Sequence, residues 1–216
     1  MDEDPPPSVP LPPAHLEPPN LINLAEGELL HRVHTPEFPG NAFNPCQGGP
    51  TRFAPIHDAL DQCIPTLYAA HTVEAAIYET ILHDVPLGAA QKSVPRAAVE
   101  SRQHSTLLVR RTLQLASLCA PDLMKWGLSP AALIGSLPTQ YGHTARWAKA
   151  LHDQFPHVDG LVWTSKLCDP DSAVVFFGDR VKDADLMVTG VRHGSDGSFL
   201  SDAYKAAQRA NILITF

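Results

Sequence analysis

The chain has 216 residues, 44% of them hydrophobic, and a formal net charge of −7 at pH 7. This length suits one folded domain with or without a tail, and folding at this size buries roughly 70% of the surface that the unfolded chain exposes. The negative charge gives no electrostatic basis for binding a phosphate backbone, so we expect no direct contact with nucleic acid.

The first 20 residues hold eight prolines and several acidic side chains. Because proline donates no backbone hydrogen bond, residues 1–20 predict a disordered or polyproline-like tail, and a ligand for a proline-binding module is the alternative. The folded domain is then expected over residues 21–216. The start lacks the positive charge and apolar stretch of a secretory signal, and no run of about 18 apolar residues could span a membrane. We expect a cytoplasmic protein, although secretion without a cleaved signal stays open.

The cysteines and histidines predict no metal site. Cys46, Cys63, Cys119 and Cys168 are far apart in sequence and include no C-x-x-C pair. A zinc site requires closer ligand spacing, so we interpret these residues as free thiols in a reducing compartment. The histidines are scattered and form no metal signature.

The first predicted element of the domain is a strand over residues 28–34. Because side chains alternate along a strand, Leu30, Arg32 and His34 share one face. The following residues, 35–50, are rich in proline, glycine and asparagine and predict a long loop, and loops of this length are commonly functional.

A second apolar run, residues 65–70, predicts a short buried strand followed at once by a helix. Thr72 is suited to be the N-cap of this helix, and Glu74 is favourable in its first turn. The apolar stripe that should face the core consists of Val73, Ala76, Ile77 and Ile81.

The rest of the chain mixes strands and helices. Residues 105–118 predict one or two strands, residues 121–137 predict short helical pieces, and residues 141–154 predict a regular helix. Further strands are expected over residues 160–165, 173–177 and 211–216, and a further helix over residues 201–208. Because these elements follow no strict βαβ rhythm, the predicted fold class is α+β.

Several common chemistries are excluded by the absence of their motifs. The chain contains no G-x-G-x-x-G, no G-x-x-x-x-G-K-[ST] and no G-x-S-x-G. The glycines at 48–49 and 194–197 are explained by turns. These observations by themselves indicate only an α+β domain.

Four sequence phrases in a fixed order carry more information. They are L-H-R-V at 30–33, G-P-T-R-F-A-P at 49–55, L-Y-A-A at 67–70 with E-A-A-I-Y-E-T at 74–80, and D-G-L-V-W-T-S at 159–165 before V-V-F-F at 174–177. Their order resembles the RES domain over residues 28–180. The resemblance implies a compact RES-like catalytic domain, with a mixed β-sheet core similar to the ADP-ribosyltransferases and flanking helices. It also implies a bacterial toxin that consumes NAD and is held inactive by a cognate Xre-type helix-turn-helix antitoxin.

Five positions match polar residues of the family, namely Arg32, Arg52, Tyr68, Glu79 and Ser165. The resemblance implies that Arg32 and Arg52 bind the diphosphate of NAD, for which the planar guanidinium fork is suited. Tyr68 would position the nicotinamide riboside end, and Glu79 would stabilise the cationic ribose of the transition state. Ser165 would orient Glu79 or bind a phosphate or hydroxyl group.

The sequence departs from the family at one of these segments and leaves the acceptor of the reaction undefined. Val33 stands where some members carry an aromatic residue, and residues 91–138 match little. We expect an NAD phosphorylase, with inorganic phosphate as co-substrate, or an NAD glycohydrolase. A protein ADP-ribosyltransferase and a catalytically inactive interaction protein remain alternatives. No cofactor beyond the NAD substrate, no metal and no membrane partner are expected, and a homo-oligomer stays open.

Overall fold

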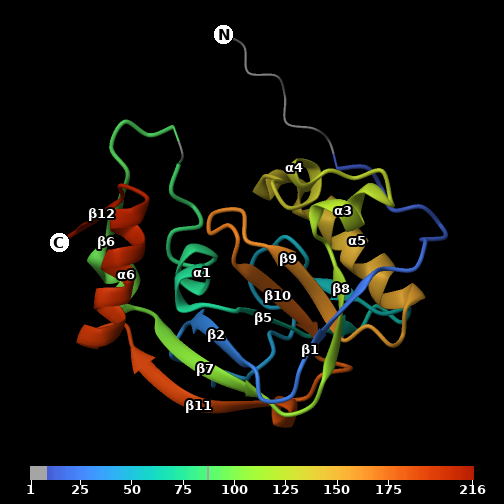
Figure 1. Cartoon of the computed structure of the whole chain (residues 1–216), viewed down its shortest axis with the longest axis horizontal. Helices are drawn as coiled ribbons and strands as arrows, with labels where there is room; N and C mark the ends of the chain where they lie inside the picture. Colours follow the sequence, from blue (N-terminus) through green and yellow to red (C-terminus); the bar gives the residue numbers. More distant parts are fainter. Residues whose placement is uncertain (1–8, 87) are drawn as a thin grey trace.

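A computed structural model describes residues 9–86 and 88–216, and a curled eight-stranded sheet forms its centre (Figure 1). The sheet strands in chain order are β1 (Leu21–Leu24), β2 (Leu29–His34), β5 (Thr66–Ala70), β7 (Gln103–Val109), β8 (Leu113–Ser117), β9 (Gly160–Thr164), β10 (Ser172–Phe177) and β11 (Leu186–His193). Their order in the sheet is β1-β8-β9-β10-β5-β2-β7-β11. Neighbours are antiparallel except β8 and β9, which are parallel. The α+β prediction with a mixed sheet is confirmed.

The helices flank the sheet in two groups (Figure 1). One group contains α1 (Val73–Tyr78), α2 (Arg96–Glu100) and α6 (Gly197–Arg209), and the other contains α3 (Ala120–Met124), α4 (Pro130–Leu133) and α5 (Tyr141–Gln154). Two-stranded ladders join β3 (Ile56–His57) to β4 (Cys63–Ile64) and β6 (Ser93–Pro95) to β12 (Leu213–Thr215). Short 3-10 helices cover Pro138–Gln140 and Asp183–Asp185. Within the described residues, no helix has the length and apolar character needed to cross a membrane.

Alternation along the strands divides the apolar side chains between the two faces of the sheet. In β10, Val175 and Phe177 join the cluster that contains α5, whereas Val174 and Phe176 join the cluster inside the curled sheet. A third cluster packs α1 against α6 over β2 and β5. The two helical groups therefore cover neighbouring parts of the sheet, and the strands between them hold both in place.

The sheet is weakest between β2 and β5. The strand β5 pairs with β10 at five positions, and β2 pairs with β7 at six. In contrast, His31 with Ala70 is the single residue pair that joins β2 to β5 in the described sheet. Because one residue pair cannot hold two strands at a constant spacing over their length, β2 and β5 diverge and leave an opening.

The elements predicted from periodicity are largely present, with differences at their ends. The helix predicted over residues 141–154 has those bounds, and Thr72 caps α1 by accepting a hydrogen bond from Ala75 N at 3.0 Å. Helix α1 ends at Tyr78, so the predicted stripe residue Ile81 lies beyond the helix. Helix α6 begins at Gly197, earlier than predicted. The strands β1 and β11, both at sheet edges, were not predicted.

The predicted tail is wrong for residues 9–20, whereas residues 1–8 lie outside the described part of the chain. Val9 and Leu16 are only 2% and 7% exposed and belong to the cluster around α5. Prolines donate no hydrogen bond, but their segment still offers carbonyl oxygens. Trp147 Nε1 donates to Pro10 O at 2.7 Å, and Trp126 Nε1 donates to Glu17 O at 3.0 Å. Two indole donors therefore anchor the segment.

The expectation of four free thiols is also wrong, because Cys46 and Cys63 form a disulfide with a Cα–Cα distance of 6.0 Å. The loop after β2 folds back against β4 and brings these two residues together, although 17 positions separate them in sequence. Cys119 and Cys168 are free, and burial raises the pKa of the Cys168 thiol to about 12. Cys46 and Cys63 therefore give no support for a reducing compartment.

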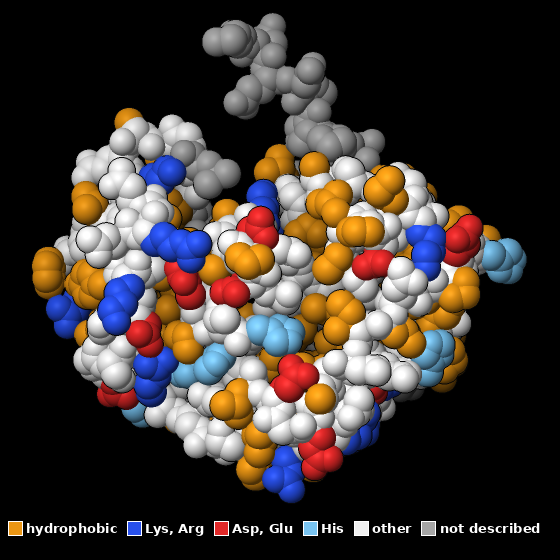
Figure 2. Space-filling model, in the orientation of Figure 1, with side chains coloured by type: hydrophobic (Ala, Val, Ile, Leu, Met, Phe, Trp, Pro, Cys, Tyr) orange, Lys and Arg blue, Asp and Glu red, His pale blue; other side chains and the backbone are white. Residues whose placement is uncertain are grey.

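The surface carries charges of both signs. On the face of the described residues shown in Figure 2, acidic and basic side chains are interspersed without a large patch of one sign. An anionic ligand would have to be held by local groups rather than by the field of the whole molecule.

Candidate active site

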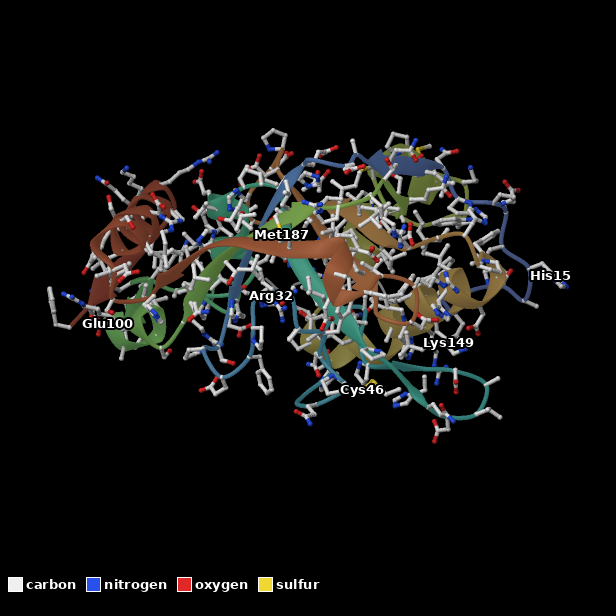
Figure 3. The ribbon with its side chains drawn as sticks, turned by 90° about the horizontal axis from the view of Figure 1, so that it is seen from below. His15, Arg32, Cys46, Glu100, Lys149 and Met187 are labelled. Atoms are coloured by element: carbon white, nitrogen blue, oxygen red, sulfur yellow. A yellow bond between two sulfur atoms is a disulfide. The ribbon has the colours of Figure 1, made fainter. Side chains whose placement is uncertain are left out.

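A cavity of about 560 Å³ lies where β2 and β5 diverge. This volume is within the range of small-molecule sites in proteins. Its walls come from β2, the segment 44–55, β5, α1 with the turn after it, and the start of α5. Four of the five predicted residues line it, namely Arg32, Arg52, Tyr68 and Glu79. Figure 3 labels two lining residues, Arg32 and Cys46, near the middle of the molecule viewed from below.

Arg52 is a buried cation whose donors are mostly unused. Its side chain is 6% exposed, and its Nη1 atom lies 3.8 Å from Glu79 Oε2, which is too long for a hydrogen bond. Its Nε atom has no hydrogen-bond partner among the described residues. The guanidinium carbon lies 5.9 Å from the centroid of the Tyr141 ring, a cation–π distance. Because a buried charge is unfavourable without a full set of partners, this arrangement suits an anionic ligand.

Glu79 is held in place from behind by Ser165. Glu79 is the C-cap residue of α1, and its side chain is 18% exposed. Its Oε1 atom accepts a hydrogen bond of 2.6 Å from the hydroxyl of Ser165, which follows β9 and is 1% exposed. Ser165 is not part of the cavity lining. The serine therefore contacts the carboxylate and leaves Oε2 as the carboxylate oxygen without a short hydrogen bond.

Tyr68 uses its ring and its hydroxyl differently. The ring lines the cavity and lies edge-on to the Trp163 ring, with centroids 6.2 Å apart. The hydroxyl oxygen accepts a hydrogen bond from Phe53 N at 3.0 Å and pairs with Thr51 Oγ1 at 3.0 Å. Burial raises the pKa of Tyr68 to about 12, so the phenol is neutral at ordinary pH. Its hydroxyl thus holds the turn that carries Arg52.

Arg32 is committed in part to the loop that follows its own strand. Its Nη1 atom donates to Gly40 O at 2.8 Å and to Ala42 O at 2.7 Å. Burial lowers the pKa of Arg32 to about 10, which still leaves it charged at pH 7. A Cβ atom at Gly40 would lie 2.3 Å from Ser105 Oγ, so glycine is required for this loop to lie against β7. Nε and Nη2 of Arg32, which lines the cavity, form no hydrogen bond within the described part of the chain.

Several lining residues were missed by sequence reasoning. They include His31, Thr80, His83, Tyr141 and Trp163. Trp163 stands inside a matched phrase, and it is 1% exposed. Its Nε1 atom is buried without a partner among the described residues. His31 lies in the matched phrase L-H-R-V, but strand alternation places it on the face opposite Arg32, so it was not predicted as a site residue. No group of three or more metal-ligating side chains occurs in the described residues.

Comparison with known proteins identifies the family of the domain. The family model described as the RES domain matches residues 29–199. The fold is similar to a chain in the crystal structure of the M. tuberculosis MbcT–MbcA toxin–antitoxin complex, with a TM-score of 0.60 and 14% sequence identity. That match covers 84% of this chain and 92% of the other. No curated protein sequence matched. Since the family model spans well over half of its length, the chain belongs to the RES-domain family.

Proposed function

We propose that this RES-domain chain is an enzyme that consumes NAD by breaking the bond between nicotinamide and ribose. One observation carries the proposal: the buried Arg52, with unused donors, lies beside Glu79 in a cavity of about 560 Å³. NAD carries one group that complements Arg52 and another that complements Glu79. Its diphosphate supplies negative charge for the guanidinium, and its ribose develops positive charge next to a carboxylate when the glycosidic bond breaks.

The chemistry needs no strong nucleophile from the protein. The nicotinamide of NAD is already cationic, so the C–N bond breaks with its electron pair leaving on nicotinamide. The ribose carbon becomes oxocarbenium-like, and Glu79 Oε2 would stabilise it while Ser165 holds Oε1. An oxygen of phosphate or water then forms the new C–O bond, and a water acceptor also loses a proton.

The other two lining residues would bind the substrate. The Tyr68 hydroxyl is engaged with the 51–54 turn, so its ring, rather than its hydroxyl, is the part suited to contact the nicotinamide face. Arg32 would add a second diphosphate contact through Nε and Nη2. The RES family and the similarity to a chain of a toxin–antitoxin complex support two further proposals. The protein would act as a toxin, and a cognate antitoxin would bind it and block the cavity.

The test is NAD turnover by the purified chain, freed of any partner, with and without inorganic phosphate. A product that forms only with phosphate would identify a phosphorylase, and ADP-ribose formed without phosphate would identify a glycohydrolase. Label from NAD found on protein would instead identify an ADP-ribosyltransferase. If NAD stays intact under all these conditions, the enzyme proposal is wrong and an interaction protein is favoured.

A further inference from the structure

A chain of four polar side chains leads from α6 through β11 and β7 to the cavity wall. Asp202 Oδ2 accepts from Arg192 Nη1 at 2.7 Å, and Arg192 Nε donates to His104 Nδ1 at 3.2 Å. The Nε2 atom of His104 lies 3.0 Å from Nδ1 of His31. His31 lines the cavity, whereas the three other residues lie outside its lining.

The chemistry of arginine sets the direction of every hydrogen bond in this chain. A guanidinium has only donors, so Nδ1 of His104 must be an acceptor and carries no proton. A neutral His104 therefore holds its proton on Nε2 and donates it to His31 Nδ1. It follows that His31, when neutral, carries its own proton on Nε2.

The packing keeps these groups in one orientation. His104 is 2% exposed and lies against the Phe199 ring, with centroids 5.7 Å apart and an interplanar angle of 17°. The His31 and His104 rings have centroids 5.2 Å apart and an interplanar angle of 20°. With their nitrogens at 3.0 Å, this separation places the rings side by side and nearly coplanar, as an in-plane N–H···N bond requires.

A second cavity histidine, His34, has no nitrogen left for a ligand. Its Nδ1 atom donates to Thr35 O at 2.7 Å, and its Nε2 atom accepts from Ser105 Oγ at 2.8 Å. In contrast, Nε2 of His31 has no hydrogen-bond partner among the described residues. His31 is thus a lining histidine with one nitrogen defined by the protein and the other left for a ligand.

We propose that His31 binds the substrate as a neutral hydrogen-bond donor, giving Nε2–H to a phosphate oxygen of the dinucleotide, and that His104 and Arg192 are the residues that position this proton. The inference rests on the proposed function, because it assigns a role toward NAD. His31 precedes Arg32 in β2, and although the two side chains leave opposite faces of the strand, both line the cavity. The proposal also means that His31 is not a general base, because its Nε2 lone pair is occupied by a proton.

The electrostatic environment agrees with a neutral pair. Burial lowers the pKa of His31, and the nearby Arg192 and His71 lower it further, while Asp202 acts in the opposite direction. Burial together with Arg192 lowers the pKa of His104 to about 3. A proton added to Nδ1 of His31 would face the Nε2–H of His104, so the hydrogen-bond chain itself resists the cationic form of His31.

The first test is long-range ¹H–¹⁵N correlation NMR of the full chain with labelled histidine at pH 7. We expect the His31 signals of a ring protonated at Nε2 only, and we expect this pattern to be lost in His104→Leu. His104→Gln should restore it, since an amide offers both an acceptor and a donor. A cationic His31, or one protonated at Nδ1, in the wild type would overturn the proposal. His193→Gln, at an exposed neighbour of Arg192 on β11, is the matched control.

The second test measures NAD kinetics of His31→Leu and His104→Leu. Loss of a hydrogen bond to a charged phosphate should raise the KM of His31→Leu about tenfold or more, with little change in kcat. His104→Leu should show a smaller rise that His104→Gln reverses, whereas a purely structural effect would lower kcat and the amount of folded protein together. An unchanged KM in His31→Leu, with NAD still consumed, would refute the role of His31 and leave the proposed function standing.

If the wild type leaves NAD intact, the proposed function fails by itself. The binding role is then judged by adding ADP-ribose as a probe to the labelled protein. A shift of the His31 Nε2 signal that is absent in Arg192→Leu would support the donor role. No shift at saturating ADP-ribose would overturn it.

Discussion

Arg52 and Arg32, which match the same family pattern, lie on separate walls of the cavity and differ in their hydrogen-bond partners. Arg52, on the turn after the Cys46 loop, is buried with a single carboxylate 3.8 Å away and with Nε unpaired. Arg32, on β2, gives its Nη1 atom to two backbone carbonyls. Arg52 therefore keeps a donor for a ligand, whereas Arg32 uses one of its nitrogen atoms to bind backbone carbonyls of its own loop.

The comparison teaches that burial alone does not identify a binding arginine. A buried guanidinium whose donors end on backbone carbonyls stabilises the fold, and one whose donors are unpaired stores unfavourable energy that an anion can relieve. The wall that contains Arg52 also contains Glu79, supported by Ser165, while the wall that contains Arg32 contains His31, supported by His104 and Arg192. Each wall thus has one ligand-facing group with a support behind it.

The largest expected effect is on the wall that contains Arg52. Glu79→Gln removes the negative charge but keeps the shape and an acceptor for Ser165. We expect NAD turnover to fall about a hundredfold to a thousandfold, because a positioned charge next to the transition state is lost. Circular dichroism and thermal unfolding should stay near those of the wild type. A fully active Glu79→Gln would show that the carboxylate is a structural group.

The disulfide should stabilise the wall that contains Arg52, because Cys46 and Cys63 close the loop in which Arg52 lies. A closed loop of this length stabilises a fold by about 3 kcal/mol in the chain-entropy model. The double variant Cys46→Ser with Cys63→Ser should lose stability of this order in urea unfolding and should raise KM. Replacing the free Cys119 by Ser is the control, and equal losses in both proteins would argue against a specific role for the disulfide.

The two arginines can be separated directly by the same substitution. Arg52→Gln should raise the KM for NAD about tenfold to a hundredfold and should lower the thermal midpoint less than Arg32→Gln does, since Arg52 has one carboxylate at 3.8 Å and no hydrogen bond to it. Arg32→Gln should lower the free energy of unfolding by about 1–3 kcal/mol, because the carbonyls of Gly40 and Ala42 lose their donor. Arg146→Gln, at an exposed position on α5, is the control. Identical stability losses at positions 32 and 52 would remove the distinction.

The smallest expected effect is the pH dependence from the wall that contains His31. Burial and Arg192 lower the pKa of His104 from its ordinary value of 6.5 to about 3 in the folded chain, with His31 and His34 acting in the same direction and Asp202 opposing. Below pH 6.5 the unfolded chain binds more protons, so stability falls as the pH falls toward 3. These two pKa values give a loss of at most about 2 kcal/mol between pH 7 and pH 5 from this site. Urea unfolding of His104→Gln should show a flatter profile, and His193→Gln should keep the wild-type slope.

Local signals in the sequence predicted most of the regular elements and the order in which they occur. The apolar periodicity of residues 141–154 and the cap at Thr72 depend on neighbouring residues only, and both predictions are confirmed. The edge strands β1 and β11 were missed because their side chains are largely exposed and their pattern is weak. The prediction for residues 9–20 considered only that proline has no N–H donor. The backbone carbonyl oxygens of this segment still accept hydrogen bonds from Trp147 and Trp126.

By itself the sequence determined the fold class, the family and the identity of the five matched polar residues. All of these follow from residue type and order along the chain. Only the tertiary structure decided that β2 and β5 diverge and that Cys46 meets Cys63. It also decided that Arg52 Nε has no hydrogen-bond partner among the described residues, whereas Arg32 Nη1 has two. These features depend on contacts between residues far apart in sequence, and no local pattern encodes which donor finds an acceptor once the chain has folded.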